Sequence, residues 1–196
     1  PRTQFNDGKC DPAGNFWAGT MGRKEEQGLG SLYMLRPDGT YEKRISGVTI
    51  SNGICWDRDG TTMYYIDTPT QVVVAYDYDL SSGNIQNPRV AVQIDPQEGQ
   101  PDGMTIDERG FLWIALWGGS AVVCYDPTTG KRIDQVELPV SLVTSCTFGG
   151  DDLQDLYITS ARIGLNENEL AKQPLAGSLF KTRLKVKGLP ASLYMG

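Results

Sequence analysis

Short apolar segments alternate with turn clusters along most of the chain. Segments of four to seven apolar and aromatic residues recur, among them NFWAGTM, SLYML, TMYYID, FLWIAL, AVVCYD and DLYITSA. Clusters such as DPAG, RPDG, DRDG and DERG separate them, and these are typical of the turns in β-hairpins. Helical periodicity is scarce, and only residues 165–171 are expected to form a single helical turn. The pattern therefore predicts an all-β chain.

The segments also repeat one another along the chain. FNDGKCDPAGNFWAGT, SNGICWDRDGTTMYYIDT and PDGMTIDERGFLWIAL share a pair of Asn or Asp with Gly, then a turn, then an apolar strand; TSCTFGGDDLQDLYITSA is a weaker fourth copy. A second pair of strands follows each copy, so one repeat holds about four strands, as in a blade of a β-propeller. A β-sandwich would not repeat at a near-constant interval, and the Gly-His and Trp-Asp signatures of WD propellers do not occur. We expect residues 1–196 to form one β-propeller domain with about four blades.

The repeated Asx-Gly pairs are candidates for a binding site. Such pairs are common turn dipeptides, but each copy has its own hairpin turn five to nine residues later, so a further turn is not needed. Equivalent residues at the start of the innermost strands of a propeller face the central channel. Aligning the copies on their glycines therefore places Asn6 or Asp7, Asn52 and Asp102 around one axis. Oxygen donors from several blades can enclose a hard cation.

Composition narrows the chemistry further. The chain has no histidine, which excludes a Ser-His-Asp or Cys-His nucleophile and leaves oxygen ligands for any metal. Its net charge of −6 argues against a nucleic-acid partner, and no apolar run is long enough to span a bilayer. The four cysteines form no CxxC pair, so we expect free buried thiols in a reducing compartment, the cytoplasm.

Taken in order, FNDGKCDPAGNFWAGTM, SNGICW, YYIDT, PDGMTID, TSCTFGG, LYITSAR and the ending AGSLFKTRLKVKGLPASLYMG resemble the regucalcin, or senescence-marker/gluconolactonase, family over nearly the whole chain. The resemblance implies a six-bladed propeller with one divalent cation (Ca, Zn, Mg or Mn) in its channel. It implies hydrolysis of sugar lactones, and a calcium-binding role in the animal members. It also implies that this chain corresponds to the C-terminal two-thirds of the family fold.

The resemblance implies roles for particular residues as well. Asn52 and Asp102 match the family's metal ligands, Asp102 is also the candidate general base, and Asn6 matches a substrate contact. Where the family motif often has an arginine that holds substrate, this chain has Gln4, which can bond a hydroxyl but has no charge; Arg2, two residues earlier on an extended strand, is a candidate to compensate. The family's glutamate ligand belongs to an N-terminal stretch that has no counterpart here, together with about two blades and the strand that closes the ring.

Three functions follow from these expectations. The first is a metal-dependent hydrolase of sugar lactones, its activity impaired by the missing N-terminal blades. The alternative is a non-catalytic, calcium-binding regulatory propeller; a third possibility is an interaction propeller without metal. The oxygen donors Asn52 and Asp102 favour the first two, and the sequence does not separate these two because both use the same cation site.

Overall fold

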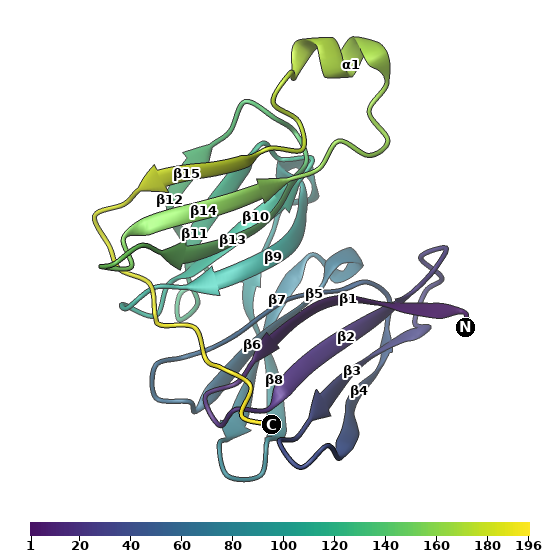
Figure 1. The fold of residues 1–196 in the computed structure, drawn as a ribbon, viewed down its shortest axis with the longest axis vertical. Helices are drawn as coiled ribbons and strands as arrows, with labels where there is room; N and C mark the ends of the chain where they lie inside the picture. The colour runs from purple at the N-terminus through teal and green to yellow at the C-terminus, as the bar shows by residue number, and fades with distance from the viewer. The chain divides into compact units, whose positions relative to one another are not determined.

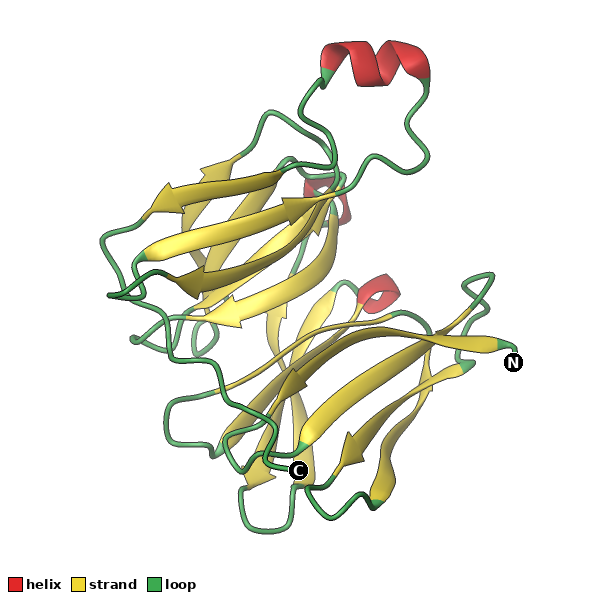
Figure 2. Cartoon of the chain, viewed as in Figure 1, coloured by secondary structure: helices red, strands yellow, loops and turns green.

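The computed structural model describes residues 1–196 and consists almost entirely of β-strands. The chain divides into two compact units: Pro1–Gln93 with Ala191–Gly196, and Ile94–Pro190. Each unit contains two antiparallel sheets in which strands that follow one another in the chain lie side by side (Figure 1, Figure 2). The sheets are four blades of a β-propeller, which confirms the predicted fold class.

The first unit contains blades one and two. Blade one is formed by β1 (Thr3–Cys10), β2 (Phe16–Gly22), β3 (Gly30–Leu35) and β4 (Tyr41–Val48); blade two by β5 (Ser51–Trp56), β6 (Thr62–Asp67), β7 (Val72–Asp79) and β8 (Asn84–Gln93), with the 3-10 helix η1 (Thr68–Thr70) after β6. Apolar side chains fill the space between the two sheets, and the Trp17 and Trp56 rings meet edge to face at 5.8 Å. This packing holds blades one and two together.

The second unit contains blades three and four. Blade three is formed by β9 (Gln100–Ile106), β10 (Leu112–Trp117), β11 (Ala121–Asp126) and β12 (Lys131–Glu137); blade four by β13 (Val143–Gly149), β14 (Asp155–Ser160) and β15 (Leu179–Arg183), with η2 (Pro96–Glu98) before β9 and the helix α1 (Glu167–Lys172) before β15. Trp113 meets Phe148 between the two sheets, with 6.0 Å between ring centroids. Blade four has three strands where the others have four. The short helix α1 lies where a single helical turn was expected.

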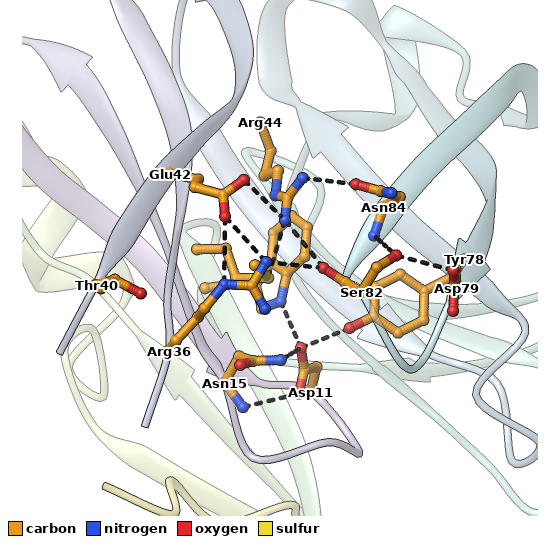
Figure 3. Close-up of polar contacts among 12 residues, drawn as sticks. Asp11, Asn15, Arg36, Thr40, Glu42, Arg44, Tyr78, Asp79, Ser82 and Asn84 are labelled. Atoms are coloured by element: carbon orange, nitrogen blue, oxygen red, sulfur yellow. Dashed lines mark hydrogen bonds and ion pairs between the residues drawn. The ribbon is translucent and has the colours of Figure 1, made fainter. Parts of the chain in front are cut away.

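An aspartate closes the hairpin at the end of each of the first three innermost strands. Asp11 is fully buried and accepts hydrogen bonds from the main-chain N–H groups of Ala13 and Asn15, the Asn15 amide, the Trp17 indole and the Tyr78 hydroxyl; Figure 3 shows it between Asn15 and Tyr78. In blade three the Trp113 indole donates to Asp107 at 3.1 Å. In blade two Asp57 accepts from the main chain of Thr61 and Thr62. These aspartates lie in the hairpin turns that the sequence predicts.

Two arginines attach the outer turn of blade two to blade one. Arg36 and Arg44 both donate to the main-chain oxygen of Ser82, at 3.0 and 3.1 Å, and both pair with the carboxylate of Glu42 (Figure 3). Arg44 also donates to the side-chain oxygen of Asn84 at 2.9 Å. The turn between β7 and β8 is thereby held against blade one.

The last residues of the chain pack on the first unit. The Met195 N–H donates to the Gly14 carbonyl at 3.1 Å, and the Tyr194 hydroxyl donates to the Arg36 carbonyl at 2.9 Å. Gly14 has a φ of +84°, and a Cβ built on it would lie 2.5 Å from Met195 Cγ, so both backbone conformation and space require glycine there. Along the sequence, the second unit is thus inserted between two segments of the first.

The four cysteines lie in strands of different blades. Cys10, Cys55, Cys124 and Cys146 belong to β1, β5, β11 and β13, and none of them forms a disulfide. Burial raises the pKa of the Cys55 thiol to about 12, so it stays protonated and unreactive at neutral pH. None of the chain's helices has the length and apolar character that crossing a membrane would require.

Candidate functional site

Each of the first three innermost strands has a β-bulge where the Asx-Gly pair occurs. In blade one Phe5 pairs with Thr20 and Gly8 with Ala18, so two residues, Asn6 and Asp7, lie opposite one. The same irregularity places Asn52 with Gly53, and Asp102 with Gly103, opposite single residues of β6 and β10. A bulge leaves one residue outside the ladder and redirects its side chain. The repeated pair is therefore a bulge, distinct from the hairpin turn.

The strand registers correct the alignment made on the glycines. Asn6, Asn52 and Asp102 each stand five residues before the hairpin aspartate of their strand, Asp11, Asp57 and Asp107. Counted in this way, Asp7 takes the place of Gly53 and Gly103, and the glycine alignment is wrong by one residue in the first copy. Of the two residues left open in blade one, Asn6 is the equivalent of Asn52 and Asp102.

The structure brings two of the predicted site residues into direct contact. The Asn6 Nδ2 donates to the Ser51 carbonyl at 2.7 Å and to Asn52 Oδ1 at 3.0 Å. Asn52 is only 8% exposed, and its own Nδ2 donates to Thr68 Oγ1 at 2.8 Å. The Ser51 carbonyl can only accept, so it sets the orientation of the Asn6 amide, which in turn sets that of Asn52. Asn52 Oδ1 keeps a second lone pair for a further partner.

A buried hydroxyl pair supports this end of β5. The Tyr65 hydroxyl donates to Ser51 Oγ at 2.6 Å. Burial raises the pKa of Tyr65 well above its ordinary value, so the hydroxyl remains a neutral donor throughout the physiological pH range. The Cβ that Gly19 lacks would stand 1.7 Å from the same Ser51 Oγ, so blade one approaches Ser51 too closely for any other residue at position 19. Ser51, and with it Asn52, is held on two sides.

A groove on blade one contains the predicted substrate contacts Gln4 and Asn6. Its volume is about 940 Å³, and aromatic side chains form much of its wall, including Phe5 and Tyr41, which are 72% and 71% exposed. Arg23 also lines this groove and its side chain makes no hydrogen bond or ion pair, whereas Arg2 lies outside the lining with its guanidinium 4.0 Å from Glu26. The groove that contains Gln4 is therefore lined by Arg23 and not by Arg2. Its place in the groove is not evident from the sequence, because Arg23 follows the end of β2, the strand that pairs with β1.

Asp102 occupies the bulge of β9 in the second unit. It is half-buried, and it follows Pro101, which is buried. The Cβ that Gly103 lacks would lie 2.2 Å from Ser145 Oγ of blade four. The side chain of Ser145 therefore packs directly on the main chain beside Asp102, and glycine is required next to the carboxylate. In blade four the equivalent bulge residue is Thr144, whose hydroxyl bonds that of Thr159 at 2.7 Å.

The chemistry of these donors fits a hard divalent cation. Asn52 offers an amide oxygen whose orientation is fixed, and Asp102 offers a carboxylate, which are the ligand types that such cations prefer. Asn52 belongs to the first unit and Asp102 to the second. No group of three or more His, Cys, Asp or Glu side chains is close enough together to hold a metal ion. Asn52 and Asp102 are thus each a donor of the type that such a cation takes.

Comparison with known proteins places these observations in a family. Residues 1–162 match the family described as SMP-30/Gluconolactonase/LRE-like region. A Bacillus subtilis (strain 168) protein named "Putative sugar lactone lactonase YvrE" is 50% identical over 185 residues, covering 94% of this chain and 63% of that protein. Regucalcin from Danio rerio is 48% identical over 199 residues, covering 100% of this chain and 68% of that protein.

The solved structures agree with the sequences. A calcium-binding protein, regucalcin, from Agrobacterium tumefaciens str. C58 is 36% identical and superposes with a TM-score of 0.94, covering 99% of this chain and 65% of that one. The chain thus spans about two thirds of the length of the relatives that it matches. On the sequence match, the blades and the superposition together, the chain belongs to the SMP-30/gluconolactonase/LRE-like family.

Proposed function

We propose that the protein is a metal-dependent hydrolase of sugar lactones. The observation that supports this most is the hydrogen bond from Asn6 to Asn52, which joins an exposed, predicted substrate contact to a buried, predicted metal ligand. Asp102 occupies the equivalent bulge position of blade three. The name of the Bacillus relative, which describes a lactonase, supports the same reaction class.

The reaction needs few groups from the protein. A bound divalent cation (Ca, Zn, Mg or Mn) would supply Lewis acidity toward a lactone carbonyl and toward water. Asn52 Oδ1 and the Asp102 carboxylate would hold that cation, and Asp102 is the general base that accepts a proton from the attacking water. Asn6 and Gln4 bond the hydroxyl groups of the sugar ring. No nucleophilic side chain is required, which is consistent with a chain that has no histidine.

The alternative is a non-catalytic, calcium-binding regulatory propeller. It uses the same two ligands, and Gln4, in place of the arginine expected from the family motif, favours it because an amide binds substrate less strongly than a guanidinium. The Agrobacterium relative is described as calcium-binding. Both functions predict metal binding, but only the hydrolase predicts turnover of a lactone, so metal binding and turnover must both be measured.

We also propose a small-molecule partner in a reducing compartment such as the cytoplasm. The groove beside Gln4 and Asn6 is of a size that suits a sugar lactone. The acidic balance of the chain argues against nucleic acid as a partner, and its four cysteines form no disulfide.

The decisive experiment measures gluconolactone hydrolysis and metal binding on the same samples. Acid release is followed by pH-stat before and after EDTA, with each of the four cations added back, and metal affinity is measured by calorimetry. We expect EDTA to abolish turnover, and Asp102→Ala to abolish both turnover and metal binding. Binding that depends on Asp102 without any turnover would replace the hydrolase with the regulatory alternative. Turnover that survives both EDTA and Asp102→Ala would overturn the proposal.

Arg23 gives a second, smaller test of the same site. If its guanidinium replaces the cation that Gln4 lacks, Arg23→Gln should raise KM for gluconolactone three- to ten-fold with little change in kcat, because it removes a contact made equally in the ground and transition states. Arg2→Gln is the matched control, since Arg2 lies outside the groove, and it should leave KM unchanged. Equal effects of the two substitutions would show a general charge effect and exclude a specific contact.

A further inference from the structure

Two neighbours hold the Asn52 amide: Asn6 donates to its oxygen, and the Thr68 hydroxyl accepts from its nitrogen. Asn52 Nδ2 donates to Thr68 Oγ1 at 2.8 Å, while Oδ1 accepts from Asn6 at 3.0 Å. A half-turn of the amide would exchange its oxygen and nitrogen, and would direct N–H groups where a cation needs an oxygen. Because an amide turned in this way repels a cation, the partner on the nitrogen side matters to any metal that Asn52 binds.

Thr68 is itself held in place by the residues around it. It is 4% exposed, it begins η1 directly after β6, and its main-chain N–H donates to the Ile50 carbonyl at 3.1 Å. The preceding Asp67 accepts from the N–H groups of Thr49 and Ile50, at 3.0 and 2.8 Å. Asp67 and Thr68 therefore fasten the end of β6 to the residues immediately before β5. The Asp67 carboxylate bonds main-chain donors, which is a structural role.

This arrangement occurs in blade two and is not required by the fold. Ser51 pairs with Asp67, just as Phe5 pairs with Thr20 and Pro101 with Leu116. The residues that follow in blades one and three, at the position of Thr68, are Met21 and Trp117. Since methionine and tryptophan occupy the equivalent positions, propeller packing at this point does not need a hydroxyl. The threonine is present in the blade whose bulge residue is an amide that has to be oriented.

We propose that Thr68 is a positioning residue that fixes the side-chain oxygen of Asn52 toward a bound divalent cation. The inference rests on the proposed function for the cation, and it adds a residue outside the ligand set. Partners of metal ligands typically change metal affinity 10- to 100-fold when they are removed. Thr68→Val keeps the shape of the side chain and removes the hydroxyl that accepts from Asn52.

The experiment measures Mn²⁺ and Ca²⁺ affinity by calorimetry for the 196-residue chain and its variants. We expect Thr68→Val and Thr68→Ala to weaken binding 10- to 100-fold, and Thr68→Ser, which retains the hydroxyl, to stay within about three-fold of the parent. Thr70→Val is the matched control from the same 3-10 helix, because its hydroxyl donates to the Asp67 carbonyl and makes no contact with Asn52. The denaturation midpoint of each variant shows that it is folded.

A second readout separates this inference from the proposed function. In the metal-free protein, the two side-chain N–H signals of Asn52 in a ¹H–¹⁵N spectrum, assigned with Asn52→Ala, report the bond to Thr68. We expect Thr68→Val to shift these signals and Thr70→Val to leave them in place. If the parent chain binds no cation, the proposed function fails while this spectrum still tests the orientation of the amide. Parent-like affinity together with unshifted signals in Thr68→Val would overturn the positioning role.

Discussion

The two ends of each innermost strand use similar residues for different purposes. At the hairpin end, Asp11 accepts five hydrogen bonds from its own blade and from Tyr78, and it is fully buried. At the bulge end, five residues earlier, Asn6 and its equivalent Asn52 bond each other, and Asn52 keeps an oxygen lone pair. A side chain whose acceptors are all engaged stabilises the fold, whereas one with spare acceptor capacity can bind a ligand.

This difference helps to separate the Asn and Asp residues that stabilise the fold from those that can bind a ligand. Both ends have an Asn or Asp near a Gly, so residue type and local motif do not separate them. The hydrogen bonds at the hairpin end distinguish it, since Asp107 resembles Asp11 in accepting from a tryptophan indole and from its own turn. The three predictions that follow compare the two ends.

The largest expected effect is at the hairpin end. Asp11→Ala leaves the Trp17 indole, the Tyr78 hydroxyl and the donors of Asn15 buried without a partner. Loss of a buried charged acceptor of this kind costs about 3–5 kcal/mol in the free energy of unfolding. Urea denaturation followed by tryptophan fluorescence measures it. A loss below about 1 kcal/mol would contradict the structural role assigned to Asp11.

The bulge end should respond in the opposite way. Asp102→Asn keeps the shape of a half-buried side chain, so we expect a change below about 1 kcal/mol in the free energy of unfolding. The same substitution should abolish turnover, because an amide cannot act as the base. Denaturation and the gluconolactone assay on one preparation check both effects. Strong destabilisation by Asp102→Asn would remove the contrast between the two ends.

The smallest effect concerns Asp7, which stands where blades two and three have the bulge glycines Gly53 and Gly103. Burial raises its pKa above the ordinary value of 3.8, although Lys9 and the Gly8 N–H oppose the shift. The folded state therefore binds more protons than the unfolded state just above pH 3.8, and this carboxyl lowers stability as the pH rises through its folded pKa. Asp7→Asn should stabilise the protein by less than about 1 kcal/mol at pH 7 and by nothing at pH 3. Urea midpoints at both pH values measure this, and a destabilised variant at pH 7 would show that the charge is favourable.

Much of the fold could be predicted from the sequence because its signals are local and repeated. The apolar segments and turn clusters predicted strands and hairpins, and the repeat predicted blades. The hairpin aspartates Asp11, Asp57 and Asp107 follow from the same turn chemistry. Each of these features depends on residues within about ten positions of one another, and such short-range patterns determine a meander sheet.

The rest depends on contacts between strands, which the sequence does not display. The register of the bulge in blade one was misaligned by one residue, because Asp7 stands where the second and third copies have glycine. Arg23 could not be found until the pairing of β1 with β2 was known. Thr68 lies 16 residues from the amide that it contacts, on the far side of a hairpin. The ligand pair Asn52 and Asp102 was predicted as oxygen donors, and its assignment to a metal site remains a proposal.

The segment Ala191–Gly196 has a consequence for the order in which the chain folds. Because these residues belong to the first unit, that unit cannot be completed when Gln93 leaves the ribosome. At about 5–20 residues per second, synthesis of the inserted unit takes roughly 5–20 s. During that interval the turn at Gly14 and the carbonyl of Arg36 lack their partners Met195 and Tyr194. Residues 191–196 thus complete a blade that is synthesised before the inserted unit.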